Sequence, residues 1–152
     1  MTASFTVYGQ SQPGGSKRAV QIGGRVRVID ANPRSAPWKD EIRHQVGAAY
    51  DGHPLLTGPL ALDLTFYQPR PKGHYGTGRN AGIVKASAPS WPASKPDLLK
   101  LARTVEDACT GLLWRDDSQI VHEALSKMYG EPARVLIRVD RVVESPVTKE
   151  AA

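Results

Sequence analysis

The sequence predicts a single α/β domain of the α+β kind, in which a mixed, mostly antiparallel sheet of short strands carries two main helices. The clearest strand is Pro59–Tyr67, which places an apolar side chain at every second position: Leu60, Leu62, Leu64 and Phe66. Two other stretches space their apolar residues as helices do. A chain of 152 residues suffices for one domain with a real core, but not for two. We assign the domain to residues 1–143 and a polar C-terminal tail to residues 144–152.

The N-terminal part predicts strands. Phe5–Tyr8 is a short β-rich run that ends in a polar segment. Ala19–Ile22 and Arg25–Ile29 alternate apolar and polar residues on either side of Gly23-Gly24, a pattern typical of a β-hairpin.

The first helix is expected after the break at Asn32-Pro33. Ser35 is suited to cap its N-terminus, and Asp51-Gly52 is suited to end it. The residues expected on its core-facing stripe are Trp38, Ile42, Val46 and Ala49.

The C-terminal half predicts a second helix followed by two strands. The core-facing residues expected on this helix are Leu98, Leu101, Val105, Ala108 and Leu112. We interpret Ile120–Tyr129 and Pro132–Val143 as a second hairpin around Gly130-Glu131-Pro132. A partly helical Ile120–Leu125 is the alternative.

The charge of the chain favours an anionic partner. The formal net charge is +5, and Pro69–Lys95 contains no acid but five basic residues: Arg70, Lys72, Arg79, Lys85 and Lys95. This stretch is also rich in Gly, Pro, Ser and Ala, with His74, Tyr75 and Trp91 among the charges. We expect residues 69–95 to form a flexible basic loop that binds a phosphate backbone. A mobile surface loop without that role is the alternative.

Several classes of protein are excluded. No apolar run is long enough to span a membrane, no secretory signal is visible, and a single cysteine, Cys109, rules out an internal disulfide. We therefore expect a cytoplasmic protein. The stretch Gly76–Gly82 lacks the Lys-Ser/Thr ending of a phosphate-binding loop, and the histidines show no metal-ligand spacing.

Acids stand at both ends of the second helix. Asp97 precedes it, and Asp116-Asp117 follow it. Helix capping and turn formation explain each acid singly, but together they suit a magnesium ion, which prefers carboxylates, water and phosphate. A strand that starts at Asp117 can return it toward Asp97. Asp107 lies about 15 Å from Asp97 along a regular helix, so these two cannot bind one ion.

Three motifs in this region resemble those of the RusA-type Holliday junction resolvases of phages and prophages. The motifs are KPDL at Lys95–Leu98, EDACTG at Glu106–Gly111, and WRDDSQIV at Trp114–Val121 with Lys127 ten residues after Asp117. The resemblance covers roughly Leu60–Val139. It implies a dimeric, magnesium-dependent endonuclease that cuts four-way DNA junctions symmetrically, with manganese as an alternative ion, in the cytoplasm of a bacterial host.

The resemblance also implies roles for individual residues, alongside the charges already described. The expected metal ligands are Asp97, Asp116 and Asp117, with Asp107 as a further candidate. The expected catalytic residues are Asp97, Asp117, Arg103 and Lys127, in an in-line attack by a metal-activated water. The expected DNA-binding residues are Arg70, Lys72, Arg79, Lys85, Lys95 and Lys100.

One position departs from the family pattern. The family reads Asp-Leu-Asp-Asn where this chain reads Asp97-Leu98-Leu99-Lys100, so Leu99 replaces the second acid. Either Asp116, Asp107 or Glu106 replaces the lost ligand, or metal binding is weaker. The alternative function is a branched-DNA binding protein that does not cut. Magnesium dependence distinguishes the two, since the affinity of a binder depends mainly on salt.

Overall fold

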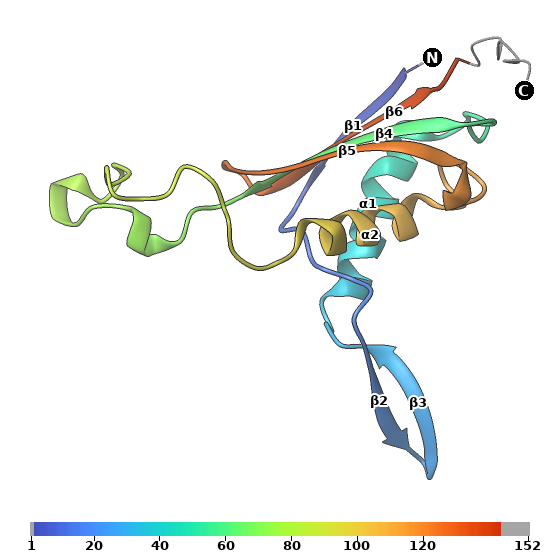
Figure 1. The fold of residues 1–152 in the computed structure, drawn as a ribbon, viewed down its shortest axis with the longest axis horizontal. Coiled ribbons are helices and arrows are strands. Elements are labelled where there is room, and N and C mark those ends of the chain that lie inside the picture. The colour runs from blue at the N-terminus through green and yellow to red at the C-terminus, as the bar shows by residue number, and fades with distance from the viewer. Residues whose placement is uncertain (1, 144–152) are drawn as a thin grey trace, which may run out of the picture.

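A computed structural model describes residues 2–143 (Figure 1). Its main sheet has the strand order β1-β6-β4-β5, and a separate hairpin is formed by β2 and β3. The strands are β1 (Thr2–Tyr8), β2 (Lys17–Ile22), β3 (Arg25–Asp30), β4 (Leu60–Gln68), β5 (Ile120–Tyr129) and β6 (Arg134–Arg141). The pairings β1–β6, β6–β4 and β2–β3 are antiparallel, and β4–β5 is parallel. The predicted α+β domain with a mixed, mostly antiparallel sheet is confirmed.

Two helices, α1 (Ser35–Tyr50) and α2 (Leu98–Cys109), pack against each other on the same face of the sheet, where α2 crosses α1 (Figure 1). The alternation in β4 explains the arrangement, because its apolar side chains are buried toward the helices. The core includes Leu60, Leu62, Leu64 and Phe66 of β4, Ile42 and Val46 of α1, Leu101 and Val105 of α2, and Val135, Ile137 and Val139 of β6.

The predicted second hairpin is wrong. β5 and β6 are both strands, but they do not pair with each other, because β4 lies between them. β6 buries Val135, Ile137 and Val139 and occupies the interior of the sheet, whereas β5 has no fully buried residue and forms an edge. The short connection after Tyr129 therefore crosses the end of β4, where the Gly130 amide donates to the Gln68 carbonyl at 2.9 Å.

Two details of α1 also differ from expectation. Ser35 is the first residue of the helix, not its cap; Arg34 is the N-cap, without a side-chain hydrogen bond. Trp38, Ile42 and Val46 are buried as predicted, but Ala49 is exposed. The helix gives way at Asp51-Gly52 as expected, and α2 ends before Gly111, whose φ of 85° is a conformation that glycine adopts at little cost.

Two segments project from the body of the molecule (Figure 1). One is the β2–β3 hairpin, and the other is the loop of residues 69–95 between β4 and α2. The loop folds on itself through two short 3₁₀ turns and a bridge between Tyr75 and Val84. Within the described residues, no helix is long and apolar enough to cross a membrane. The predicted tail at 144–152 lies outside these residues.

Candidate active site

α2 and β5 run side by side in opposite directions, and this arrangement determines where the acids lie. At the start of α2, the Lys127 ammonium near the end of β5 donates to the carbonyls of Ser94 and Pro96, at 2.6 and 2.9 Å. Toward the other end of α2, Glu106 lines a surface hollow together with Asp117, which precedes β5, and Glu123 on β5. Glu106, Asp117 and Glu123 are called the acidic cluster below.

The carboxylates of the acidic cluster interact strongly. The pKa of Glu106 is raised to about 8, first by burial, then by a hydrogen bond and the charge of Glu123, and further by the charges of Asp117 and Asp107. Burial and nearby like charges both favour the protonated form of a carboxyl group, and the hydrogen bond to Glu123 uses that proton. The cluster therefore holds a proton where a cation would satisfy the same oxygen atoms.

Asp117 is fixed by the turn in which it lies. The turn Asp117–Gln119 is capped by Asp116, whose carboxylate accepts from the Ser118 amide at 2.9 Å. The same amide, followed by the Ser118 side chain, lowers the pKa of Asp116. The Gln119 side chain accepts from the Asp116 amide at 3.1 Å and donates to the carbonyls of Leu56 and Gly58 at 3.0 and 3.1 Å. Asp116 thus stabilises the turn, and the turn places Asp117 beside Glu106 and Glu123.

The chemistry of the acidic cluster fits a divalent cation, since three carboxylates supply the hard oxygen atoms that magnesium and manganese prefer. Glu106 is partly buried beside these acids, and after burial itself their hydrogen bond and charges raise its pKa. Even so, among residues 2–143 no group of three or more His, Cys, Asp or Glu side chains is arranged to hold a metal ion. The acidic cluster of one chain thus supplies carboxylates of the right chemistry, but does not by itself form a complete metal site.

Asp97 lies away from the acidic cluster. It is the N-cap of α2 without a side-chain capping bond, and its carboxylate is 3.9 Å from the Lys100 ammonium. Asp97, Lys95, Lys100 and Lys127 line one hollow at the start of α2. Nine residues separate Asp97 from Glu106, which is about 13 Å along a helix axis. One chain therefore cannot place Asp97 and the acidic cluster around the same ion.

Leu99, Arg103 and Glu106 follow one another along a single face of α2, at helical spacings of four and three residues. Leu99, at the position of the missing acid, is 72% exposed. The Arg103 side chain is also exposed, and its Cγ and Cδ atoms pass close to Gly15 in the N-terminal segment. An acid at 99 would thus reach solvent on the same side of α2 as Glu106.

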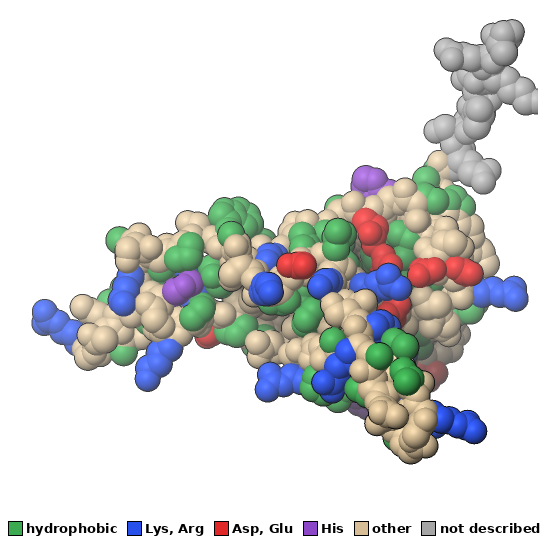
Figure 2. All heavy atoms as spheres, turned by 60° about the horizontal axis from the view of Figure 1, so that its bottom comes forward, with side chains coloured by type: hydrophobic (Ala, Val, Ile, Leu, Met, Phe, Trp, Pro, Cys, Tyr) green, Lys and Arg blue, Asp and Glu red, His purple; other side chains and the backbone are tan. Residues whose placement is uncertain are grey.

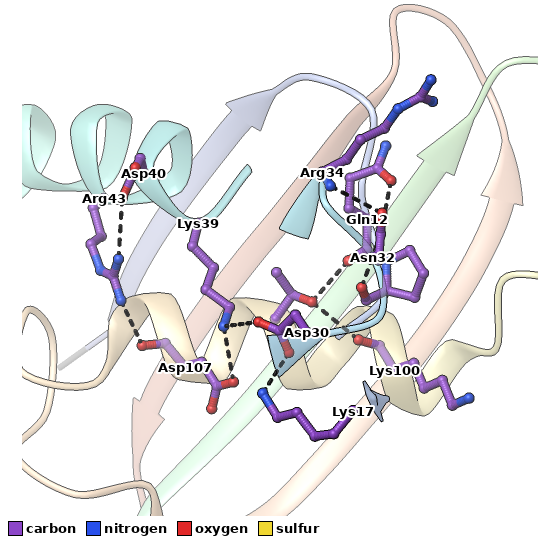
Figure 3. A network of polar contacts seen from close by, with 12 residues as sticks. Gln12, Lys17, Asp30, Asn32, Arg34, Lys39, Asp40, Arg43, Lys100 and Asp107 are labelled. Atoms are coloured by element: carbon purple, nitrogen blue, oxygen red, sulfur yellow. Dashed lines mark hydrogen bonds and ion pairs between the residues drawn. The ribbon is translucent and has the colours of Figure 1, made fainter. Parts of the chain in front are cut away.

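Asp107 has a structural partner. Its carboxylate is 3.5 Å from the Lys39 ammonium of α1, which also lies 3.9 Å from the Asp30 carboxylate of β3 (Figure 3). Asp30 is bonded in turn to Lys17, and its pKa is lowered, first by that hydrogen bond. Asp107 thus joins α2 to α1 and to the hairpin.

The predicted DNA-binding residues divide into two groups. Lys72, Arg79, Lys85 and Lys95 are exposed along the 69–95 loop, and Lys100 is exposed beside Asp97. Arg70 instead holds the loop, donating to the Pro89 carbonyl at 2.7 Å and lying 4.3 Å from the centre of the Tyr129 ring. Figure 2 shows most of the acidic side chains of this face gathered together, with Lys and Arg spread over the face, including positions beside the acids.

Sequence reasoning missed Glu123 and gave Glu106 only a secondary place. The signal for Glu106 was its position seven residues after Leu99, on the same side of a helix. Glu123 carried no signal, because its closeness to Glu106 follows from β5 pairing in parallel with β4 at the edge of the sheet.

The raised pKa of Glu106 predicts a dependence of stability on pH. Between about 4.5, its ordinary value, and about 8, the folded protein retains a proton that the unfolded chain has lost. The unfolded state binds fewer protons in this range, so the free energy of unfolding falls as pH rises. Thermal denaturation from pH 5.5 to 8.5 is expected to show this loss in the parent protein and a smaller loss in Glu106→Gln. Equal pH dependence in both proteins would contradict the raised pKa.

Comparison with known proteins identifies the family to which the chain belongs. Residues 8–140 match the family described as Endodeoxyribonuclease RusA. The chain is also 29% identical over 143 residues to YqaN, an uncharacterised protein of Bacillus subtilis (strain 168), an alignment that spans 91% of this chain and 95% of YqaN. The family match extends over most of the described domain, from the end of β1 to β6, and includes all three motifs that carried the resemblance. The chain belongs to the RusA family of endodeoxyribonucleases.

Proposed function

We propose that this protein is a divalent-metal-dependent endodeoxyribonuclease that resolves Holliday junctions and related branched DNA by paired, symmetric hydrolysis of phosphodiester bonds. Membership of the RusA family supports the junction-resolving activity. The single observation that supports the metal is the acidic cluster, in which burial and neighbouring carboxylates raise the pKa of Glu106 to about 8. We propose magnesium as the ion, with manganese able to replace it.

Each part of the site has a proposed task. Asp117 is the central metal ligand, with Glu106 and Glu123 beside it, and Asp116 holds the turn that presents Asp117. A bound magnesium ion would supply an activated water and stabilise charge on the phosphate. Arg103, exposed on the same face of α2 as Glu106, is placed to contact the scissile phosphate. Lys127 secures the start of α2 through the carbonyls of Ser94 and Pro96.

The site is proposed to be completed in a homodimer. Two symmetric cuts in a four-way junction require two active sites related by a two-fold axis, and closed two-fold dimers are the commonest assembly. The length of α2 keeps Asp97 away from the acidic cluster of its own chain. We propose that Asp97 of one subunit supplies the ligand that the acidic cluster of the other subunit lacks. This arrangement makes metal binding depend on dimer formation.

The alternative function is a branched-DNA binding protein that does not cut, and Leu99 is the observation that favours it. Leu99 cannot bind a metal, and its 72% exposure leaves it without a role in the core. Under this alternative, Leu99→Asp would create cleavage in an inactive parent protein. Under the proposed function, the parent protein already cuts, and the same substitution changes the rate by less than about ten-fold, because the site completed by Asp97 of the other subunit already holds its metal without an acid at position 99.

The experiment that separates the two functions uses a labelled four-way junction and a linear duplex of the same sequence, each incubated with the protein in magnesium or in EDTA. We expect paired nicks in the junction with magnesium only, and no cutting of the linear duplex. Binding of the junction in all conditions without cutting, with manganese also tried, would contradict the nuclease and support the binding protein.

A further inference from the structure

The β2–β3 hairpin takes no part in the proposed metal centre, and it extends away from the sheet and helices (Figure 1). Its strands pair only with each other, and most of its side chains are exposed, none of them buried. An isolated two-stranded ribbon is marginally stable in water unless something packs on it or anchors it. The structure therefore raises the question of what holds this ribbon and what it binds.

The two faces of the hairpin differ in charge. The register pairs Arg18 with Ile29, Val20 with Arg27, and Ile22 with Arg25, so the arginines share one face. We call Arg18, Arg25 and Arg27 the arginine face. All three are exposed, and within residues 2–143 none of them makes an ion pair with an acid. The opposite face carries Val26 and Val28, which are 73% and 69% exposed.

The base of the hairpin is anchored firmly to both helices (Figure 3). Asp30 bonds to Lys17 across the ribbon and lies 3.9 Å from Lys39 of α1. The segment before β2 is bonded to α2, since the Thr104 hydroxyl donates to the Gln12 carbonyl at 2.8 Å and the Gly14 amide donates to the Lys100 carbonyl at 3.0 Å. A side chain at Gly14 would meet the Thr104 hydroxyl at 2.7 Å. The hairpin therefore has a defined position relative to α2, which carries Glu106.

We propose that the hairpin is a DNA-binding arm, whose arginine face contacts the phosphate backbone of a duplex arm of the substrate. This inference rests on the proposed function for the identity of the polyanion, and it adds a contact outside the 69–95 loop. Three arginines without acidic partners on one face complement a row of phosphates. A two-stranded ribbon also has the dimensions that the major groove admits. Because the base of the hairpin is bonded to α2, a duplex bound by the arginine face has a defined position relative to α2.

The test compares two double variants that remove the same charge. Arg25→Gln with Arg27→Gln alters the arginine face, whereas Arg138→Gln with Arg141→Gln alters exposed arginines of β6. Binding to a labelled four-way junction is measured by fluorescence anisotropy in EDTA at several salt concentrations, so that no cutting occurs. For the hairpin variant we expect affinity at ~0.1 M salt to fall roughly ten-fold or more and the salt slope to shrink by about 2. The β6 variant is expected to retain both values within about two-fold.

Crosslinking supplies a second test that does not depend on affinity. The only cysteine, Cys109, is buried, and burial raises the pKa of its thiol to about 12, so it reacts poorly. Ile22→Cys, near the tip of the hairpin, exposed and on the arginine face, therefore provides a single site for a photoactivated crosslinker. We expect crosslinks to a duplex arm of the junction.

The results of these experiments distinguish the proposed DNA-binding role of the hairpin from the proposed nuclease activity. A hairpin variant that binds like the parent protein, together with no crosslink from position 22, would overturn the arm while leaving metal-dependent cutting intact. A parent protein that binds through the arm but never cuts would overturn the nuclease and leave the arm in place. A parent protein that binds no junction would overturn both.

Discussion

Replacing Asp117 by asparagine is expected to abolish junction cleavage while leaving junction binding intact. The asparagine would keep the size of the side chain but lose the charge that a magnesium ion requires of its central ligand. We expect the cleavage rate to fall at least about 100-fold, since changes that only touch a ligand's neighbours already cost roughly 10- to 100-fold. The turn that carries residue 117 depends on Asp116 and Gln119, so the fold is expected to remain. Single-turnover cleavage and anisotropy measure the two properties separately.

Asp63→Asn is the matched control for this variant. Asp63 is exposed on β4, the strand beside β5, and the substitution makes the same change of charge outside the acidic cluster. Its cleavage rate is expected to stay within about two-fold of the parent protein. Full cleavage by Asp117→Asn, or an equal loss in Asp63→Asn, would contradict the assignment of Asp117 to the metal.

Mixing two inactive variants is expected to restore activity. Asp97→Asn and Asp117→Asn should each be inactive alone, because each removes one ligand from both sites of the dimer. In a dimer with one subunit of each kind, one site contains both substitutions and the other site contains neither. Random reassociation makes about half of the dimers mixed, so nicking of the junction should return to about one quarter of the parent level. Nicking is measured after the two variants are unfolded together and refolded.

Size-exclusion chromatography and differently tagged subunits establish that mixed dimers have formed. Continued inactivity of purified mixed dimers would show that Asp97 and Asp117 do not act across the subunit interface. Full activity of Asp97→Asn alone would remove Asp97 from the metal site altogether. Glu106→Gln mixed with Asp117→Asn serves as the control, because both residues belong to the same acidic cluster, and no activity is expected to return.

The sequence predicted most of the fold because its local patterns agree with the final packing. The alternation of Leu60, Leu62, Leu64 and Phe66 predicted β4, and the helical spacing of Leu101, Val105 and Ala108 predicted the buried face of α2. The Gly23-Gly24 turn predicted the β2–β3 hairpin. These features depend on neighbours along the chain, which sequence periodicity reports directly.

Strand order and the shape of the site could not be predicted in the same way. Nothing between Tyr129 and Pro132 indicates that β4 lies between β5 and β6, since the order depends on which strand buries more apolar surface. The same parallel pairing of β5 with β4 brings Glu123 to Glu106. The acids at the two ends of α2 were correctly located along the chain, but the length of the helix separates them in space.

The most direct measurement of the metal centre is an NMR titration of the protein with manganese, whose unpaired electrons broaden the signals of nearby amides. We expect early and selective broadening of the amides around Glu106, Asp117 and Glu123, together with those around Asp97 from the second subunit. The tip of the β2–β3 hairpin should stay sharp, and added magnesium should reverse the effect. Broadening that leaves the amides around Glu106, Asp117 and Glu123 unchanged would contradict a metal bound by the acidic cluster.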